Sequence, residues 1–282
     1  MQNKFIPNRP GSKDISWCPG CGNFGIRAIL MEVFEELDLS PNKIVIVSGI
    51  GQAAKMPHYI NVNGFHTLHG RAIPIATGVK IANSELTVIA EGGDGDMYAE
   101  GGNHFIHGIR RNPDTTVIIH NNQIYGLTKG QASPTTMMGV KTTAQPQGVF
   151  EEPFNAVSVA ISLDASFVAR TFVGYKDLTK KIIKEAIKNK GFSFVEIFQP
   201  CVSFNKINTY EWYEKNTYFI NNHDPYNKIE AMKIAMRTDY FPVGIIYRSD
   251  KKDFNKNVGL TKPIFNKKIN KKKLKELIWN FV

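Results

Sequence analysis

The chain has 282 residues, 42% of them hydrophobic, which is enough to bury a sizeable core in one large domain. Its formal net charge is +10, and no apolar run approaches the roughly 18 residues needed to span a bilayer. The N-terminus lacks the basic-then-apolar pattern of a signal peptide. We therefore expect a cytoplasmic protein that does not contact a membrane.

The first motif along the chain is a Cys-x-x-Cys pair, Cys18 and Cys21, and Cys201 is the third and last cysteine. An odd, small number of cysteines argues against the disulfide framework of a secreted protein. A zinc site needs a second pair about 12 to 20 residues further on, and the sequence has none. A thioredoxin-like redox pair would follow a first strand, which is not predicted before Trp17. Thiolates also favour iron–sulfur clusters.

Strands and helices alternate over the first 200 residues. Four short apolar runs rich in β-branched residues are typical of strands buried on both faces of a parallel sheet, and the segments between them are helical in pattern. In chain order we expect a helix at 24–39, a strand at 43–50, a helix at 70–83, a strand at 86–93, a helix at 99–111, a strand at 115–122, a helix at 175–190 and a strand at 192–200. This alternation predicts an α/β fold, doubly wound around a mostly parallel sheet with helices on both faces.

After about residue 204 the pattern changes. Residues 223–242 predict one helix ended by a proline, and the remainder is basic and irregular before a final amphipathic helix at 274–282. We therefore predict an α/β domain at 1–204 and a C-terminal extension at 205–282.

Two lysine-rich runs, 251–257 and 267–273, carry much of the positive charge. A solvated tail is the simplest interpretation of such runs. Docking of an acidic protein partner and nucleic-acid binding are the alternatives, and we expect no nucleic-acid binding.

Glycines and polar residues come directly after each of the four predicted strands, at 49–51, 92–96, 121–126 and 200–201. In open α/β sheets, ligands bind outside the carboxyl ends of the strands. Four motifs at the same edge of the sheet therefore predict one site.

The glycine-rich turn after the second strand suits a phosphate, but it carries Asp94 and Asp96 instead of a lysine. Two carboxylates would repel a phosphate unless a cation lay between them. Mg²⁺ is suitable because it takes a few protein oxygens and completes its octahedron with phosphate oxygens and water. Asn122 supplies a neutral oxygen after the next strand, and the turn that follows offers a backbone carbonyl. An EF-hand calcium loop is excluded because its final glutamate is missing.

A GDG turn followed, after the next strand, by an asparagine pair resembles the fingerprint of thiamine-diphosphate enzymes. The wider sequence is similar to the β subunits of 2-oxoacid:ferredoxin oxidoreductases, up to about residue 245. The similar segments are WCPGCGNFGI (17–26), SGIGQAAK (48–55), GFHTLHGRA (64–72), EGGDGDMYAEGGNHF (91–105), NNQIYGLTKGQASPTT (121–136) and QPCVSFN (199–205).

This resemblance implies a thiamine-diphosphate-binding fold and oxidative decarboxylation of a 2-oxoacid to acyl-CoA and CO2, with electrons passed to ferredoxin. Lys55 and the segment GLTKGQASPT resemble the 2-oxoglutarate branch more than the pyruvate branch. In this family the glutamate that activates the cofactor comes from the α subunit. The resemblance therefore implies a hetero-oligomer, and an isolated chain without activity.

The resemblance also implies roles for individual residues. It places Asp94, Asn122 and the carbonyl of Ile124 on magnesium. Lys55, near the substrate carboxylate, and His69, against the cofactor, are the candidate catalytic residues; without the resemblance they would be taken as a surface lysine and a structural histidine. The positions that match the cofactor-lining residues of the family are Ile50, Gly51, Gln52, Ala53, His69, Gly95, Asp96, Gly126 and Leu127.

Cys18, Cys21 and Cys201 match ligands of the family's [4Fe–4S] cluster. Well-known members have a fourth cysteine in the glycine turn after the first strand, where this chain has Gln52. A cluster here would need a non-cysteine ligand or an open iron, and a three-iron cluster or no cluster are the alternatives.

Two other functions remain as hypotheses. Because Gln52 replaces the family's fourth cysteine, a non-oxidative thiamine-diphosphate-dependent 2-oxoacid decarboxylase is the first alternative. A basic, non-catalytic binding module with a Cys-x-x-Cys metal knuckle is disfavoured by the motifs at 91–136.

Overall fold

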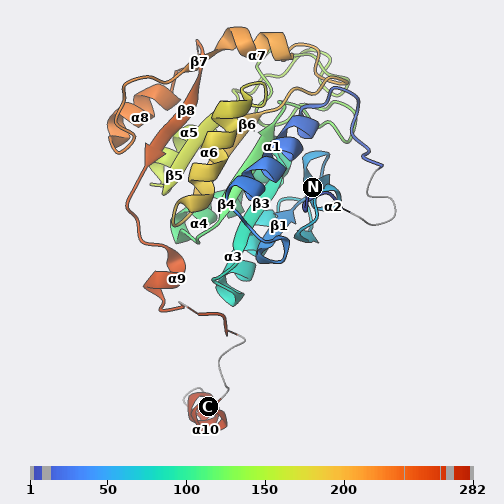
Figure 1. The fold of residues 1–282 in the computed structure, drawn as a ribbon. Helices are drawn as coiled ribbons and strands as arrows, with labels where there is room; N and C mark the ends of the chain where they lie inside the picture. The colour runs from blue at the N-terminus through green and yellow to red at the C-terminus, as the bar shows by residue number, and fades with distance from the viewer. Residues whose placement is uncertain (1–2, 8–13, 238, 261, 265–269, 280–282) are drawn as a thin grey trace.

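The computed structural model describes residues 3–7, 14–237, 239–260, 262–264 and 270–279. An open eight-stranded sheet, ordered β2-β1-β3-β4-β6-β5-β8-β7, forms its centre (Figure 1). Every neighbouring pair is parallel except β5 and β8. The strands are β1 (Ile44–Ser48), β2 (Asn63–His66), β3 (Thr87–Gly93), β4 (Thr116–Asn121), β5 (Phe167–Phe172), β6 (Ser193–Phe198), β7 (Thr217–Phe219) and β8 (Phe241–Arg248).

Helices cover both faces of the sheet (Figure 1). The apolar sides of α1 and α6 pack with one face of the strands, and those of α3, α4, α5 and α8 pack with the other. The doubly wound, mostly parallel α/β fold expected from the sequence is confirmed. The helices and helical turns are α1 (Gly22–Glu36), η1 (Pro41–Lys43), η2 (Ala53–Lys55), α2 (Met56–Tyr59), α3 (Ala72–Ala82), η3 (Gly95–Glu100), α4 (Gly102–Arg111), α5 (Ala156–Ser162), α6 (Lys176–Lys188), α7 (Tyr210–Asn216), α8 (Lys228–Ala235), α9 (Phe254–Asn257) and α10 (Lys271–Trp279).

The strands and helices expected in the first 200 residues are all present. Their apolar residues occur at the positions that face the core, so the sequence pattern predicts them well. β1, β4 and β6 are buried along their whole length, as uninterrupted apolar runs predict for central parallel strands. The helix α6 turns Ile182, Ile183 and Ala186 into the core and its lysines toward solvent.

Several elements were not expected, and the segment after residue 204 is less irregular than predicted. β8 is a mostly buried strand that pairs antiparallel with β5 and parallel with β7, so this segment extends the main sheet. The expectation that a proline ends the helix at 223–242 was wrong. The helix α8 ends at Ala235, and Pro242 lies inside β8.

The side chain of Asn112 links three segments at the end of the sheet where β5 and β6 begin. It follows α4 in the left-handed conformation, with a φ of 56°. Its Oδ1 accepts hydrogen bonds from Phe192 N (2.7 Å) and Ser166 Oγ (2.8 Å). Its Nδ2 donates to the carbonyls of Lys251 and Lys252, both at 3.1 Å. One buried side chain thus links the start of β6, the start of β5 and the segment that follows β8.

The C-terminal predictions fall partly outside the described residues. Residues 280–282 of the expected last helix and 267–269 of the second basic run belong to the part of the chain that is not described. Of the helices that are described, none is both long enough and apolar enough to cross a membrane.

Candidate functional site

The carboxyl ends of four adjacent strands, β1, β3, β4 and β6, lie at one edge of the sheet. In the paired registers Ser48 lies beside Glu91, Gly93 beside His120, and Asn121 beside Phe198. The polar segments identified in the sequence follow these positions directly. The structure therefore brings the four segments to one place, as parallel pairing requires.

Asp94 follows β3 and is 1% exposed. Its Oδ2 accepts hydrogen bonds from Ser133 Oγ (2.5 Å) and Thr135 Oγ1 (2.6 Å). Burial raises the pKa of this carboxyl to about 6, although the two hydroxyl bonds act in the opposite direction. Ser133 and Thr135 were not among the site residues predicted from the sequence. The signal was present, because both lie in the unusually polar segment 121–136.

Asn122 belongs to a tight turn that follows β4. Gln123 has a φ of 58°, and its N–H donates to Asn121 Oδ1 at 3.1 Å. Asn122 Oδ1 accepts from Ile124 N at 3.1 Å, a second side-chain bond of the same kind. Because β3 and β4 are neighbours, the turn lies beside Asp94, and Thr135 Oγ1 lies within hydrogen-bonding distance of both Asp94 Oδ2 and Asn121 Oδ1. We call Asp94, Asn122, Ile124, Ser133 and Thr135 the metal edge.

Asp96, in η3, joins the two loops that contain Ile50 and Gly70. Its Oδ1 accepts from Gly70 N (2.7 Å) and Ile50 N (3.1 Å), and His69 Nδ1 lies 2.7 Å from the same oxygen. Burial raises the pKa of the Asp96 carboxyl, while its hydrogen bonds lower it. A Cβ on Gly49 would lie 2.0 Å from Asp96 Oδ2, so only glycine fits there. Asp96 therefore has a structural contribution beyond the cofactor-lining role assigned from the sequence.

The remaining predicted residues surround this edge at different depths. Ala53 is buried, whereas Ile50, Gly51, Gln52 and Lys55 are partly exposed. Lys55 Nζ donates to Ser16 Oγ at 2.9 Å, which points it toward the N-terminal segment.

Two further predicted residues, Gly95 and Leu127, differ in their surroundings. A Cβ on Gly95 would lie 2.3 Å from the Tyr125 ring, so this glycine allows close packing. The Tyr125 hydroxyl bonds to Glu100, whose Oε2 lies 3.4 Å from His69 Nδ1. Leu127 is 41% exposed and does not belong to the core.

Cys18, Cys21 and Cys201 line one small pocket together with Gln52 and Asn122. The other lining residues are Trp17, Asn23, Gly126, Gln199, Val202, Ser203 and Phe204. Burial, followed by the neighbouring thiols of Cys201 and Cys18, raises the pKa of the Cys21 thiol to about 11. Gln52 Oε1 and Asn23 Nδ2 are buried and have no hydrogen-bond partner among the described residues. We call this group the cysteine pocket.

The two groups differ in how well they fit what they were predicted to hold. The metal edge offers an oxygen donor set, from a buried carboxylate and an amide, that suits Mg²⁺. The cysteine pocket supplies three thiols, but its cavity is only about 30 Å³, roughly the volume of one water. Within the described residues, no group of three or more His, Cys, Asp or Glu side chains is arranged to hold a metal ion. The pocket therefore brings three thiols together but leaves little free space between them.

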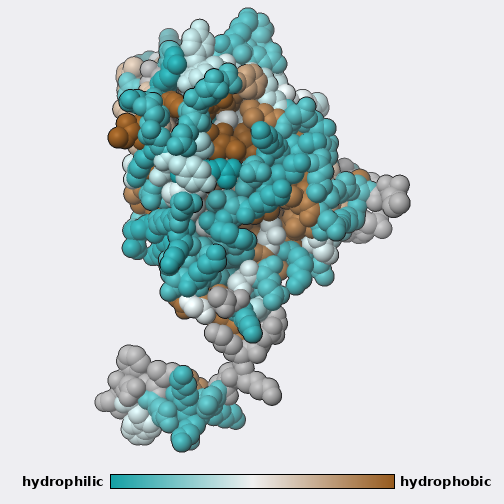
Figure 2. Space-filling view, turned by 60° about the vertical axis from the view of Figure 1, so that its left-hand side comes forward, coloured by the Kyte–Doolittle hydropathy of each residue, from teal (hydrophilic) through white to brown (hydrophobic). Residues whose placement is uncertain are grey.

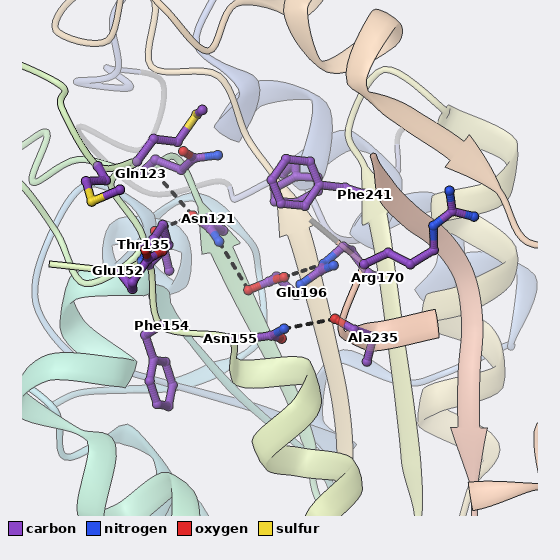
Figure 3. Close-up of a pocket in the computed structure, with 15 residues that line it drawn as sticks. Asn121, Gln123, Thr135, Glu152, Phe154, Asn155, Arg170, Glu196, Ala235 and Phe241 are labelled. Atoms are coloured by element: carbon purple, nitrogen blue, oxygen red, sulfur yellow. Dashed lines mark hydrogen bonds and ion pairs between the residues drawn. The ribbon is translucent and has the colours of Figure 1, made fainter. Parts of the chain in front are cut away.

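A cavity of about 360 Å³ lies next to the metal edge, beside the ends of α5 and α8 (Figure 3). None of the residues given an individual site role from the sequence lines it, although Asn121, Gln123 and Thr135 belong to the polar segment 121–136. Its polar wall contains Asn121, Glu196 and Arg170, joined by hydrogen bonds, and its apolar wall includes Phe154 and Phe241. Figure 2, which brings the α8 side forward, shows brown apolar patches among mainly hydrophilic side chains in the upper half of that face.

Two families of known domains match the chain. Residues 46–197 match the thiamine pyrophosphate enzyme, C-terminal TPP binding domain. Residues 201–262 match the C-terminal part of the pyruvate ferredoxin oxidoreductase beta chain.

Curated proteins and a solved structure are similar over most of the chain. A 2-oxoacid:ferredoxin oxidoreductase subunit beta from Saccharolobus solfataricus is 44% identical over 249 residues, 83% of this chain and 82% of the relative. A 2-oxoglutarate synthase subunit KorB from Methanocaldococcus jannaschii is 44% identical over 188 residues, 67% of this chain and 70% of the relative. A 2-oxoglutarate:ferredoxin oxidoreductase from Magnetococcus marinus, solved with 2-oxoglutarate, coenzyme A and succinyl-CoA bound, matches with a TM-score of 0.91 and 34% identity, covering 99% of this chain and 96% of that one.

Proposed function

Because the chain belongs to the β subunits of the 2-oxoacid:ferredoxin oxidoreductases, we propose that it holds thiamine diphosphate through Mg²⁺ at the metal edge and that its substrate is 2-oxoglutarate. The name of the Methanocaldococcus jannaschii relative and the ligands of the Magnetococcus marinus structure support this substrate. The products are then succinyl-CoA and CO2, with electrons passed to ferredoxin.

One observation carries the cofactor proposal. Asp94 and the turn with Asn122 follow two adjacent parallel strands, and the Thr135 hydroxyl lies between Asp94 and Asn121. The Asp94 carboxylate, the Asn122 amide oxygen and the Ile124 carbonyl are the proposed ligands of Mg²⁺. When bound, thiamine diphosphate supplies the carbanion chemistry that decarboxylation of a 2-oxoacid requires.

In this proposal, residues of the chain itself bind and orient the metal, the cofactor and the substrate. The hydroxyls of Ser133 and Thr135 donate to one oxygen of Asp94, and the backbone amides of Asp94 and Gly95 also bond to this carboxylate, so its orientation is fixed before a cation binds. Asp96 fixes the loops at Ile50 and Gly70 on either side of the cofactor-lining positions. Lys55 is partly exposed, and its hydrogen-bond partner among the described residues is the neutral hydroxyl of Ser16, so its ammonium group can still bind a carboxylate of the substrate.

We also propose that Cys18, Cys21 and Cys201 bind an iron–sulfur cluster. The support is their common pocket and the soft thiolate donors that such clusters prefer. Because the cavity is small, this binding requires the pocket to open. A cytoplasmic location suits this proposal, since thiols stay reduced there.

The α subunit and ferredoxin are the proposed protein partners. Large apolar side chains are exposed at the carboxyl edge of the sheet, Phe65 in β2 and Leu68, Leu127 and Phe204 on loops. Exposed apolar side chains grouped around a site are typical of a surface that another chain covers.

The experiment is anaerobic co-purification with the α subunit, followed by thiamine, magnesium and iron analysis and by CoA-dependent reduction of ferredoxin. We expect turnover with 2-oxoglutarate to exceed turnover with pyruvate, and we expect the chain alone to be inactive. Full turnover by the chain alone, or a complex that takes up no thiamine diphosphate, would contradict the proposal.

A second candidate is a non-oxidative 2-oxoacid decarboxylase. Gln52 in the cysteine pocket, in the place of the family's fourth cysteine, favours it. The two functions differ in colour and product: the oxidoreductase is brown when purified anaerobically and forms an acyl-CoA, whereas the decarboxylase is colourless and releases an aldehyde.

A further inference from the structure

A row of hydrogen bonds runs from the edge of the 360 Å³ cavity to the metal edge (Figure 3). Arg170 Nε, on β5, donates to Glu196 Oε2 on β6 at 2.6 Å. Asn121 Nδ2, at the end of β4, donates to Glu196 Oε1 at 3.1 Å. Thr135 Oγ1 lies 2.8 Å from Asn121 Oδ1 and 2.6 Å from Asp94 Oδ2.

We propose that Glu196 is a positioning residue for the magnesium ligands, and that it acts through Asn121 on Thr135 and on the turn at 121–124. The inference rests on the proposed function, because it assumes that Asp94 and Asn122 bind the metal.

Glu196 determines the orientation of the Asn121 amide. A carboxylate accepts hydrogen bonds and donates none, so Glu196 requires the NH2 group of Asn121 to face it. The amide oxygen must then face the opposite way, where it accepts from Gln123 N and meets the Thr135 hydroxyl. The bond from Gln123 N shapes the turn that presents Asn122 and Ile124. One carboxylate therefore determines the side-chain orientation on which both halves of the metal edge depend.

Glu196 is itself held rigidly. Arg170 and Glu196 are direct partners in the β5–β6 pairing. The Arg170 guanidinium also lies over the rings of Phe198 (5.3 Å) and Phe241 (5.6 Å). None of the five residues in the row is more than 6% exposed, so water competes poorly for their hydrogen bonds.

The Thr135 hydroxyl has one proton and two acceptors. Ser133 Oγ donates to the same oxygen of Asp94, so that carboxylate keeps one donor when Thr135 donates to Asn121. The row is therefore compatible with an ionised Asp94.

A purely structural role for the buried ion pair is the competing explanation. Replacing a buried ion pair by apolar side chains is often neutral for stability, so stability alone is a weak reason for one at this position. Tyr98 separates the two explanations, because its hydroxyl also donates to Glu196 Oε1, at 2.7 Å, from outside the row.

The experiment measures Mn²⁺ binding by electron paramagnetic resonance in the complex with the α subunit, after removal of metal and in the presence of thiamine diphosphate. For Glu196→Gln we expect the Mn²⁺ dissociation constant to rise by about 10- to 100-fold, the usual effect of losing a residue that orients a metal ligand. At saturating metal, kcat should stay within about twofold of the original, because the ligands themselves are intact.

Two variants serve as controls. Tyr98→Phe removes a donor to Glu196 but leaves the row intact, so its Mn²⁺ affinity should not change. Glu185→Gln removes a Glu–Arg pair with Arg248 (2.9 Å) away from the metal edge and should also leave the affinity unchanged. If Glu196→Gln does not fold, Glu196→Asp keeps the charge but shortens the side chain, and the same loss of affinity is expected.

The outcomes are distinct. A folded Glu196→Gln or Glu196→Asp complex with unchanged Mn²⁺ affinity overturns the proposal, and so does an equal loss of affinity in Tyr98→Phe. Failure of the unmodified complex to bind Mn²⁺ contradicts the proposed function instead.

Discussion

The metal edge and the cysteine pocket are neighbours, but they are organised to different degrees. A Cβ placed on Gly126 would lie 3.7 Å from Cys201 Sγ and 3.8 Å from Asn122 Nδ2, so this glycine borders both. At the metal edge Asp94 has two hydroxyl partners. In the cysteine pocket Gln52 Oε1 is buried without a partner among the described residues.

The comparison indicates two ways of preparing a binding site. The metal edge is assembled by the chain itself, so its geometry should exist before the cofactor arrives. The cysteine pocket has donors but little space, so its geometry should depend on what it binds. This difference leads to four predictions, beginning with the largest expected effect.

Asp94→Asn should abolish Mg²⁺-dependent binding of thiamine diphosphate and all turnover, since it removes the charged ligand. The same change should stabilise the metal-free chain. A pKa raised from 3.8 to about 6 corresponds to a cost of about 3 kcal/mol at neutral pH, part of which the neutral amide avoids. Cofactor binding by isothermal calorimetry and urea unfolding check the two parts. A variant that loses both stability and binding would show that Asp94 is mainly structural.

Cys21 should react with iodoacetamide about 100-fold more slowly than an ordinary thiol at pH 8. The thiolate is the reactive form, and a pKa of about 11 against the usual 9.0 lowers its population by about that factor. Cys18 is exposed and should be labelled first, as peptide mass spectrometry can follow. Equal rates at the two thiols would mean that the pocket is already open without its occupant.

Gln52→Cys should raise the iron retained per chain after anaerobic reconstitution by a few-fold, because it adds a fourth thiolate to the cysteine pocket. Ala53→Cys, at the neighbouring buried position, is the matched control and should have no such effect. If iron content and visible absorbance do not change in Gln52→Cys, the fourth position is not a ligand site.

The stabilisation of the chain by Mg²⁺ should increase as pH rises. Asp94 is protonated more readily in the folded chain than in the unfolded chain, so the metal-free protein loses stability as pH rises from about 4 to about 6 and is level above that. A cation displaces this proton below pH 6 but not above it. The Tm shift caused by Mg²⁺ should therefore be larger at pH 7.5 than at pH 5 by a few degrees. A shift that is the same at both values would contradict the raised pKa.

The fold class and the position of the site could be predicted because both depend on local pattern. The apolar runs of β1, β3, β4 and β6 report burial on both faces, and residues after parallel strands must meet at one edge. The membership in the oxidoreductase family, inferred from motifs such as that at 121–136, is confirmed by the comparisons. The roles of individual site residues remain predictions.

The strands β5 and β8 were not predicted because their sequences lack a clear strand pattern. β5 contains Arg170 and β8 contains Pro242, and both features weaken a strand pattern that tertiary pairing nevertheless stabilises. The row from Arg170 to Asp94 joins residues far apart in sequence, on three strands, a loop and the turn after β3, so no spacing rule could predict it. The sequence does contain one indication of a buried polar group, because Glu196 is a charged residue inside the otherwise apolar run SFVEIF.

The side chain of Asn112 has a consequence for biosynthesis. Two of its four hydrogen bonds are made to Lys251 and Lys252, and β8, which covers the edge of β5, ends shortly before them. A nascent chain must therefore expose the unpaired edge of β5 until β8 has also left the ribosome. Exposed edges recruit other strands, so the emergence of β8, rather than formation of the early βα units, ends the period in which this edge is prone to aggregate.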